Sequence, residues 1–442
     1  MTVIDTRGYQ LSGANDTSLA AYERGLRELN LFCGDPVASA DAALAASPGF
    51  VMAHALKAWL NLLGTEPAGV PVAHDALEAA MRLPTTDQEQ RHLIAISHLV
   101  DGRWHMASRV LEDLTMEYPR DLLALQVGHQ VDFFRGDARM LRDRIARALP
   151  AWSPDMPGYH AMLGMHAFGL EEAGQYAQAE RSGRQAVELE PRDAWAQHAV
   201  AHVMEMQGRQ KEGIAWMRGN TDGWSRDSFF AVHNWWHLAL YHLELGEIDD
   251  VFTLFDGPIY GARSGVILEM IDASAMLWRL HLRGMDVGNR WDAVADAWEP
   301  VANAGLYAFN DVHAMMAFVG AGRRQSAKRV LGAQIEAMRR AGDNAAFTRE
   351  VGHPVTVGIH AFGEGNYAET VRQLRSVRNI ANRFGGSHAQ RDVLDLTLIE
   401  AALRSGQQAV AAALSAERAA TKPASPLARL FVERASSMAK AA

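Results

Sequence analysis

The stretch Gly174-Gln-Tyr176-Ala-Gln-Ala179, followed by Ala186 and Pro191, decides the fold of this chain of 442 residues. It combines a turn glycine, an aromatic residue, two small residues on one helical face and a proline that ends the helix. Similar glycines recur along the chain, at intervals of 34, 38, 34 and 38 residues and then after one wider gap: Gly102, Gly136, Gly174, Gly208, Gly246 and Gly322. Such a period predicts a helical-repeat array, in which each helix pair buries its apolar face by stacking on its neighbours.

The segments between these glycines have the apolar period of helices, and no strand-like alternation extends over more than a few residues. We therefore predict an all-α fold, a single continuous solenoid over residues 1–442. The repeats are expected to be more regular over 16–257. After Gly246 the intervals widen, which predicts irregular helical repeats over 258–442 and leaves open whether they close the groove.

Composition limits the functional classes. The net charge of −9 and the absence of a Lys/Arg cluster predict that nucleic acid is not a partner. A single cysteine, Cys33, excludes an internal disulfide framework and cysteine-rich metal sites. The start of the chain lacks the apolar run of a secretory signal, and the most apolar stretch, 229–243, is too short for a membrane span. We expect a cytoplasmic protein with no membrane partner, and a homo-oligomer is left open.

The spacing of Gly174, Tyr176, Ala179, Ala186 and Pro191 resembles the tetratricopeptide repeat. More specifically, the chain resembles the family called tetratricopeptide repeat protein 38. That resemblance implies an α-solenoid and gives no reaction, whereas the tetratricopeptide label alone suggests peptide binding. It rests on four motifs: His233-Asn-Trp-Trp-His237-Leu-Ala-Leu-Tyr241, Asn310-Asp311-Val-His313-Ala, Val351-Gly-His353-Pro354 and Gly385-Gly-Ser-His388-Ala-Gln390-Arg391-Asp392.

Histidine and tryptophan are unusually frequent for a helical array, with 18 and 11 residues. In repeats of this kind the first helix of each pair lines the concave side. Residues three or four apart share a helix face, so histidines at that spacing present their rings side by side. The sequence therefore predicts a histidine-lined patch on the concave surface, built from three successive first helices: His198, His202 and Glu205, then His233, Trp236 and His237, then Asp311 and His313.

One interpretation of the patch is a divalent metal site, with zinc as the obvious ion. Histidines at i and i+4 are how helices present zinc ligands, although no H-E-x-x-H motif is present. Two histidine pairs on adjacent helices supply four ligands. If a metal binds, the expected ligands are His198, His202, His233 and His237.

A second interpretation is a closed pocket with acid–base histidines. An imidazole titrates near neutral pH, and a neighbouring carboxylate orients it. Tryptophans would wall the pocket, and an arginine near a helix start would anchor an anion. The expected catalytic residues are His202, His237, His313, Asp311 and Glu205, with Glu244 as a further orienting carboxylate. The expected binding residues are His198, His233, Trp236, His388 and Arg391, with Trp195, Trp224 and Trp235 as further walls.

The third interpretation is packing, because histidines often hydrogen-bond across a helix stack and tryptophans often fill gaps. We assign His54, His74, His92, His105 and His281 to this role. For the cluster, the preferred hypothesis is a small polar ligand or substrate in a His/Trp-lined pocket, with hydrolase or lyase chemistry by acid–base or metal-assisted steps. The alternative is a non-catalytic scaffold that binds a peptide or partner protein in its groove.

Overall fold

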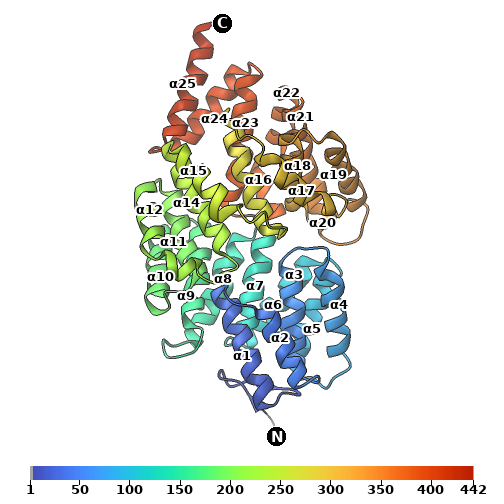
Figure 1. Cartoon of the computed structure of the whole chain (residues 1–442). Helices are drawn as coiled ribbons and strands as arrows, with labels where there is room; N and C mark the ends of the chain where they lie inside the picture. The colour runs from blue at the N-terminus through green and yellow to red at the C-terminus, as the bar shows by residue number, and fades with distance from the viewer. Residues whose placement is uncertain (1–2, 442) are drawn as a thin grey trace. The chain divides into compact units, whose positions relative to one another are not determined.

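The computed structural model describes residues 3–441, and most of them are helical (Figure 1). The only strands within that range are β1 (Val3–Ile4) and β2 (Gln10–Leu11), which pair antiparallel. The remaining elements form antiparallel helix pairs that follow one another along the chain. The predicted all-α solenoid is thus confirmed.

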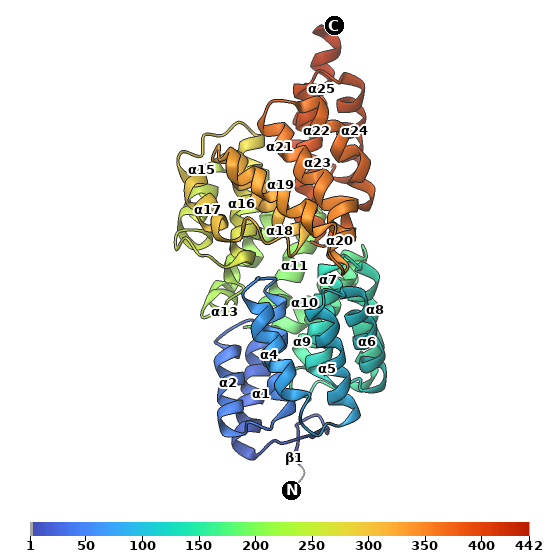
Figure 2. The ribbon, with the colours of Figure 1, turned by 90° about the vertical axis from the view of Figure 1, so that its right-hand side faces the viewer.

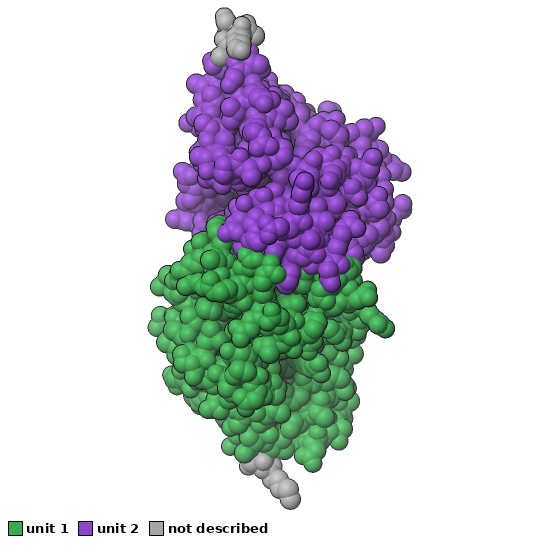
Figure 3. Space-filling view, turned by 90° about the vertical axis from the view of Figure 1, so that its left-hand side faces the viewer, with its two compact units in different colours: residues 1–200, 220–231, 341–343 green, residues 201–219, 232–340, 344–442 purple. Residues whose placement is uncertain are grey.

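The contacts divide the chain into two compact units (Figure 3). Unit 1 comprises residues 1–200, 220–231 and 341–343, and unit 2 comprises residues 201–219, 232–340 and 344–442. The division falls inside one helix, α11 (Ala194–Met206). The continuous solenoid over 1–442 and the two subregions of different regularity stay predictions.

The helices before α11, together with the short α13, belong to unit 1. They are α1 (Asp16–Leu31), α2 (Pro36–Ala46), α3 (Val51–Leu63), α4 (Gly69–Ala80), α5 (Asp87–Val100), α6 (Trp104–Glu117), α7 (Leu122–Phe134), α8 (Ala138–Ala148), α9 (Tyr159–Glu172), α10 (Tyr176–Leu189) and α13 (Thr221–Ser225). Consecutive helices such as α9 and α10, or α1 and α2, pack against each other.

The later helices lie in unit 2, apart from the first residue of α14. They are α12 (Gln210–Gly219), α14 (Ala231–Leu245), α15 (Ile248–Leu254), α16 (Ile267–Leu282), α17 (Arg290–Trp298), α18 (Ala308–Gly320), α19 (Arg324–Ala337), α20 (Asn344–Phe347), α21 (His353–Gly363), α22 (Tyr367–Val377), α23 (His388–Arg404), α24 (Gln408–Thr421) and α25 (Pro426–Ala441). Pairing continues here, since α18 packs on α19, α21 on α22 and α23 on α24 (Figure 2).

Each recurring glycine sits at the turn inside a helix pair, in the left-handed conformation. At Gly174, with φ +76°, the next amide, that of Gln175, donates to the carbonyl of Leu170 at 2.8 Å. This bond closes the helix end in the Schellman manner, which requires a positive φ that glycine adopts without strain. The same conformation and bond recur at Gly102, Gly136, Gly208, Gly246, Gly284, Gly322, Gly365 and Gly406.

One member of this series, Gly284, fills the gap that the sequence pattern left. It lies 38 residues after Gly246 and 38 before Gly322, and its φ is +71°. The aromatic residue that follows two positions after Gly102 and Gly174 is absent here, since the next one is Trp291. The glycine period therefore continues past Gly246, and α16 and α17 form a helix pair of the ordinary kind.

The small residues of the deciding stretch are required by close helix packing. Ala179 and Ala186 of α10 have no exposed surface. A Cβ atom on Gly183, between them, would approach the side chain of Val200 to 2.6 Å. A larger residue on this face would push the helices apart, because interiors are packed without spare volume.

Candidate functional site: a histidine–carboxylate cluster

Three first helices, α11, α14 and α16, carry the polar side chains of the candidate site. Helix α11 begins at a buried cap, Asp193, whose carboxylate accepts the amide of Ala196 at 2.8 Å. His202 and Glu205, in the last turns of this helix, belong to unit 2. We define the candidate site as the unit 2 residues His202, His233 and His237 with the carboxylates of Glu205 and Asp272.

His233 of α14 is held by a carboxylate on the next first helix. Its Nδ1 lies 2.9 and 3.0 Å from the two carboxylate oxygens of Asp272 on α16. A carboxylate only accepts, so Nδ1 carries the proton and Nε2 is the nitrogen with the lone pair in the neutral ring. Both side chains are largely buried, with 15% and 3% of their surface exposed.

His237, one turn later, has the same arrangement with a different helix. Its Nδ1 donates to Glu205 of α11 at 3.0 Å. Burial lowers the pKa of His237 well below its usual range, and the charges of His202, His233 and Arg279 lower it further. Burial also raises the pKa of Glu205. His237 is therefore a neutral imidazole at neutral pH, with Nδ1 as donor.

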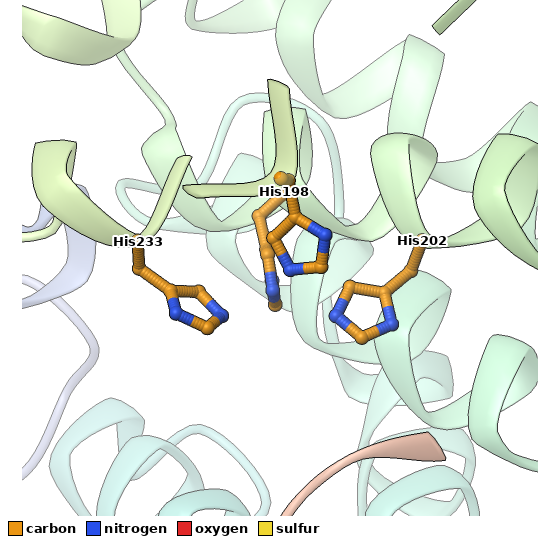
Figure 4. Close-up of side chains that lie close together, drawn as sticks. His198, His202 and His233 are labelled. Atoms are coloured by element: carbon orange, nitrogen blue, oxygen red, sulfur yellow. The ribbon is translucent and has the colours of Figure 1, made fainter. Parts of the chain in front are cut away.

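His202 completes the cluster. Its ring centre lies 4.4 Å from that of His237, and the rings of His233 and His237 are 4.9 Å apart. One ring nitrogen from each of these three lies within 4.8 Å of the others. Figure 4 shows His202 and His233 of unit 2 with their rings turned toward a common region.

Trp236 connects the histidines to a buried arginine. Its indole stacks on the ring of His233 at 5.4 Å and meets His237 edge-on at 5.0 Å. The guanidinium of Arg279, on α16, lies over the same indole at 5.2 Å. A cation over an indole face is attracted by the ring's negative potential, so Arg279 is positioned next to the cluster.

The other residues with a predicted catalytic or orienting role lie outside the candidate site. His313 is buried, and its Nδ1 donates to the carbonyl of Phe309 at 2.8 Å. No hydrogen bond joins Asp311 to a histidine in the described part of the chain; burial raises the pKa of Asp311 to about 7. Glu244 accepts from Ser425 and faces Arg283. The catalytic roles given to His313 and Asp311, and the orienting role of Glu244, stay predictions.

The two predicted binding residues of the C-terminal motif lie at the start of α23. His388 is exposed. Arg391 donates to the carbonyl of Gly386 and reaches His388 at 3.4 Å. Ser387 caps the helix and Gln390 completes the capping box, as the sequence indicates. This accounts for the motif as a helix start, and anion binding there stays a prediction.

The predicted aromatic walls are divided between the two units. Trp195 and Trp224 are buried in unit 1, where Trp195 packs on His198 with ring centres 5.0 Å apart. Trp236 contacts the unit 2 histidines through the ring pairs described above.

The sequence analysis missed Asp272 of the candidate site and Arg279, which lies next to it. Both lie on α16, which Gly284 follows, and because this glycine was missed, α16 was not recognised as a first helix. A signal was available in the helix before Gly284, because Asp272 and Arg279 are seven positions apart and therefore lie on one helix face.

No protein-family model matches the chain. Among solved structures, a monomeric mutant of IFIT1 with Gppp-AAAA aligns over 96% of this chain and 96% of its own, with a TM-score of 0.42 and 12% identity. The prediction that nucleic acid is not a partner is wrong on this comparison, since that structure contains Gppp-AAAA. It rested on net charge, a sum over the whole chain that does not report on local surfaces.

None of the helices in residues 3–441 combines the length and the apolar character that a membrane span requires.

Proposed function

We propose that unit 2 is a metal-assisted hydrolase or lyase for a small polar substrate, with His202, His233 and His237 as ligands of a divalent ion of the zinc type. One observation carries the proposal. Two histidines donate Nδ1–H to buried carboxylates and lie beside a third histidine, all within reach of one ion. Histidine ligands of metals characteristically donate their other ring nitrogen to a carboxylate, which fixes the tautomer and the ring orientation.

Charge supports the same proposal. Neutral imidazoles are the form that binds metal, and burial keeps His237 neutral by lowering its pKa. When ionised, the carboxylates of Asp272 and Glu205 place two negative charges next to the histidines. A divalent cation would balance them.

Three protein ligands leave one position of a tetrahedral ion for water or substrate. An ion in such a site lowers the pKa of bound water to about 7 and polarises a carbonyl or phosphoryl oxygen. Trp236 shields one side from bulk water. Hydrolysis, or a lyase step that starts with proton removal, fits this arrangement.

The test is metal content in protein purified without a polyhistidine tag. After equilibration with Zn²⁺ and removal of excess ion, the wild type should retain about one equivalent, measured by mass spectrometry. His237→Gln and His202→Gln should each retain less than about a tenth. His281→Gln, on α16 outside the cluster, is the matched control and should retain the wild-type amount.

The supporting carboxylates give a graded second test. Asp272→Asn and Glu205→Gln preserve shape but remove the negative charge, and each should weaken Zn²⁺ binding about 10–100-fold. Less than about a tenth of an equivalent in the wild type would overturn the metal proposal. With no turnover as well, the peptide-binding scaffold would be the better hypothesis.

A further inference from the structure

Arg279 is a buried arginine without a carboxylate partner. The residue is 3% exposed. Its guanidinium donates to two backbone carbonyls, that of Ala275 at 3.2 Å and that of Ala389 at 2.8 Å. Among the described residues, no carboxylate oxygen lies within 4.0 Å of it. A guanidinium has five N–H donors, and its positive charge is costly to bury without an opposite charge.

Other buried arginines of the chain are paired. Arg144 in unit 1 meets Asp132 at 2.8 Å, and Arg418 in unit 2 meets both oxygens of Asp392 at 2.7 and 3.0 Å. Burial lowers the pKa of Arg279 to about 10, whereas Asp392 and Glu205 act on it from a distance. Each of those two carboxylates already accepts a hydrogen bond elsewhere, Asp392 from Arg418 and Glu205 from His237. Arg279 therefore retains charge and donors that the protein itself does not satisfy.

Its position links it to the histidine cluster. Arg279 and Asp272 are seven residues apart on α16, so they share a helix face, and Asp272 holds His233. The guanidinium lies over Trp236, whose indole contacts both His233 and His237. A ligand on Arg279 would lie next to the proposed metal.

His313 provides an independent observation. It is 1% exposed, its Nδ1 donates to Phe309, and its Nε2 has no hydrogen-bond partner in the described residues. Burial, and to a lesser extent the charge of Arg279, lowers the pKa of His313 to about 4. The helices that carry the two residues, α16 and α18, pack on each other. A buried acceptor nitrogen without a donor is costly, and a hydroxyl of a bound ligand would satisfy it.

We infer that Arg279 binds an oxyanion of the substrate, a carboxylate or a phosphate, next to the histidine cluster, with His313 accepting from a hydroxyl group of the same molecule. That the anion belongs to a substrate rests on the proposed function; anion binding itself does not. Arginine suits the role because its planar donors match both oxyanions in bidentate fashion.

The test uses inorganic phosphate and acetate as probes, titrated calorimetrically into the full-length, metal-free protein. Arg279→Met keeps the aliphatic stem and should weaken binding of the preferred anion at least about tenfold. Arg279→Lys keeps the charge and should lose less. Arg283→Met, at the C-cap of the same helix where the arginine faces Glu244, is the control and should bind as the wild type does. Tighter phosphate binding indicates a phosphorylated substrate, and tighter acetate binding indicates a carboxylic acid.

The outcomes separate the two proposals. Failure of both anions to bind the wild type, or equal binding by wild type and Arg279→Met, overturns the anion site. Zinc content of Arg279→Met should stay at the wild-type level, because Arg279 is not a ligand. Anion binding that depends on Arg279 in a protein that retains no zinc would support the anion site and overturn the metal site. If Arg279→Met does not fold, the comparison of Arg279→Lys with wild type decides.

Discussion

Two buried arginines, Arg144 in unit 1 and Arg279 in unit 2, have different partners. In unit 1 the guanidinium of Arg144 is completely buried. Its Nε donates to a carboxylate oxygen of Asp132 at 2.8 Å, and its Nη2 donates to the hydroxyl of Ser108 at 3.2 Å. In unit 2 Arg279 is almost as deeply buried but donates only to backbone carbonyls and faces an indole. A buried cation with its own carboxylate is satisfied in the empty protein. A buried cation without one is suited to an incoming anion.

Histidines show the same contrast. His92 of unit 1 uses both ring nitrogens inside the fold, at 2.9 Å from Asp121 and 3.2 Å from the indole nitrogen of Trp59. His237 of unit 2 also has a carboxylate on one nitrogen, but the ring of His202 lies beside it at 4.4 Å. A His–carboxylate pair is thus a packing element in one unit and part of the histidine cluster in the other. The neighbours of the pair, and not the pair itself, carry the functional information.

The largest effect on stability is expected from breaking the buried ion pair between Arg144 and Asp132 in unit 1. Asp132→Ala leaves Arg144 as an uncompensated buried cation, and breaking a buried pair in this way costs about 3–5 kcal/mol of unfolding free energy. Urea denaturation followed by circular dichroism measures the loss. Asp41→Ala removes an exposed partner of Lys57 and should cost less than about 1 kcal/mol.

A second variant tests whether the charge causes the loss. Asp132→Ala combined with Arg144→Met removes both charges and should recover a large part of the stability, because apolar side chains can replace a buried pair. No recovery would mean that Asp132 stabilises unit 1 through its bond to Ser108 and through packing, and the contrast with Arg279 would lose its basis.

The fold was largely predictable from the sequence because its signal is local. A turn glycine and small residues at the helix contacts are required by a positive φ and by close packing, and both can be recognised in a short stretch such as that from Gly174 to Ala186. The period itself marks Gly284, 38 residues after Gly246, but the sequence analysis did not include it in the series. For this reason α16 was not recognised as a first helix.

The candidate site was predictable only in part. The spacing of His233 and His237 places them on one face of a helix, and the period places that helix next to the one carrying His202. Which carboxylate each histidine meets depends on side-chain reach between helices, and Asp272 lies 39 residues from His233. That Arg279 has no carboxylate partner among the described residues depends on the three-dimensional packing around it, which the sequence does not reveal.

An intermediate effect is expected from pH, through a buried histidine of unit 1. His129 lies edge-on against Phe168 and Trp195, and its pKa is lowered to about 3, first by burial and then by the charge of Arg144. Between that value and about 6.5 the unfolded chain binds a proton that the folded chain does not. Stability is therefore complete above about pH 6.5 and is lost as the pH falls, by about 2 kcal/mol from pH 7 to 5 for this group.

Replacing the histidine isolates this contribution. His129→Phe should lose about 2 kcal/mol less than the wild type between pH 7 and 5, measured by urea denaturation at each pH. His74→Phe, at an exposed position, should leave the pH profile unchanged. If the unfolding free energies of His129→Phe and wild type depended on pH in the same way, His129 would be protonated in the folded protein. The interior of unit 1 would then accept an unpaired charge.

The smallest effect tests whether stability and binding are separate properties of unit 2. Gly332 is exposed in the middle of α19, and a Cβ atom there would meet no atom within 4 Å. Gly332→Ala should raise the unfolding free energy by about 0.4–1 kcal/mol, because alanine reduces the freedom of the unfolded chain and favours helix. Gly320→Ala should destabilise instead, since its Cβ would lie 2.2 Å from the indole of Trp291. Zinc and anion affinities of Gly332→Ala should equal those of the wild type. A changed affinity in this variant would mean that the histidine cluster depends on the stability of the whole unit, and binding could then not be assigned to the local charges around Arg279 and His237.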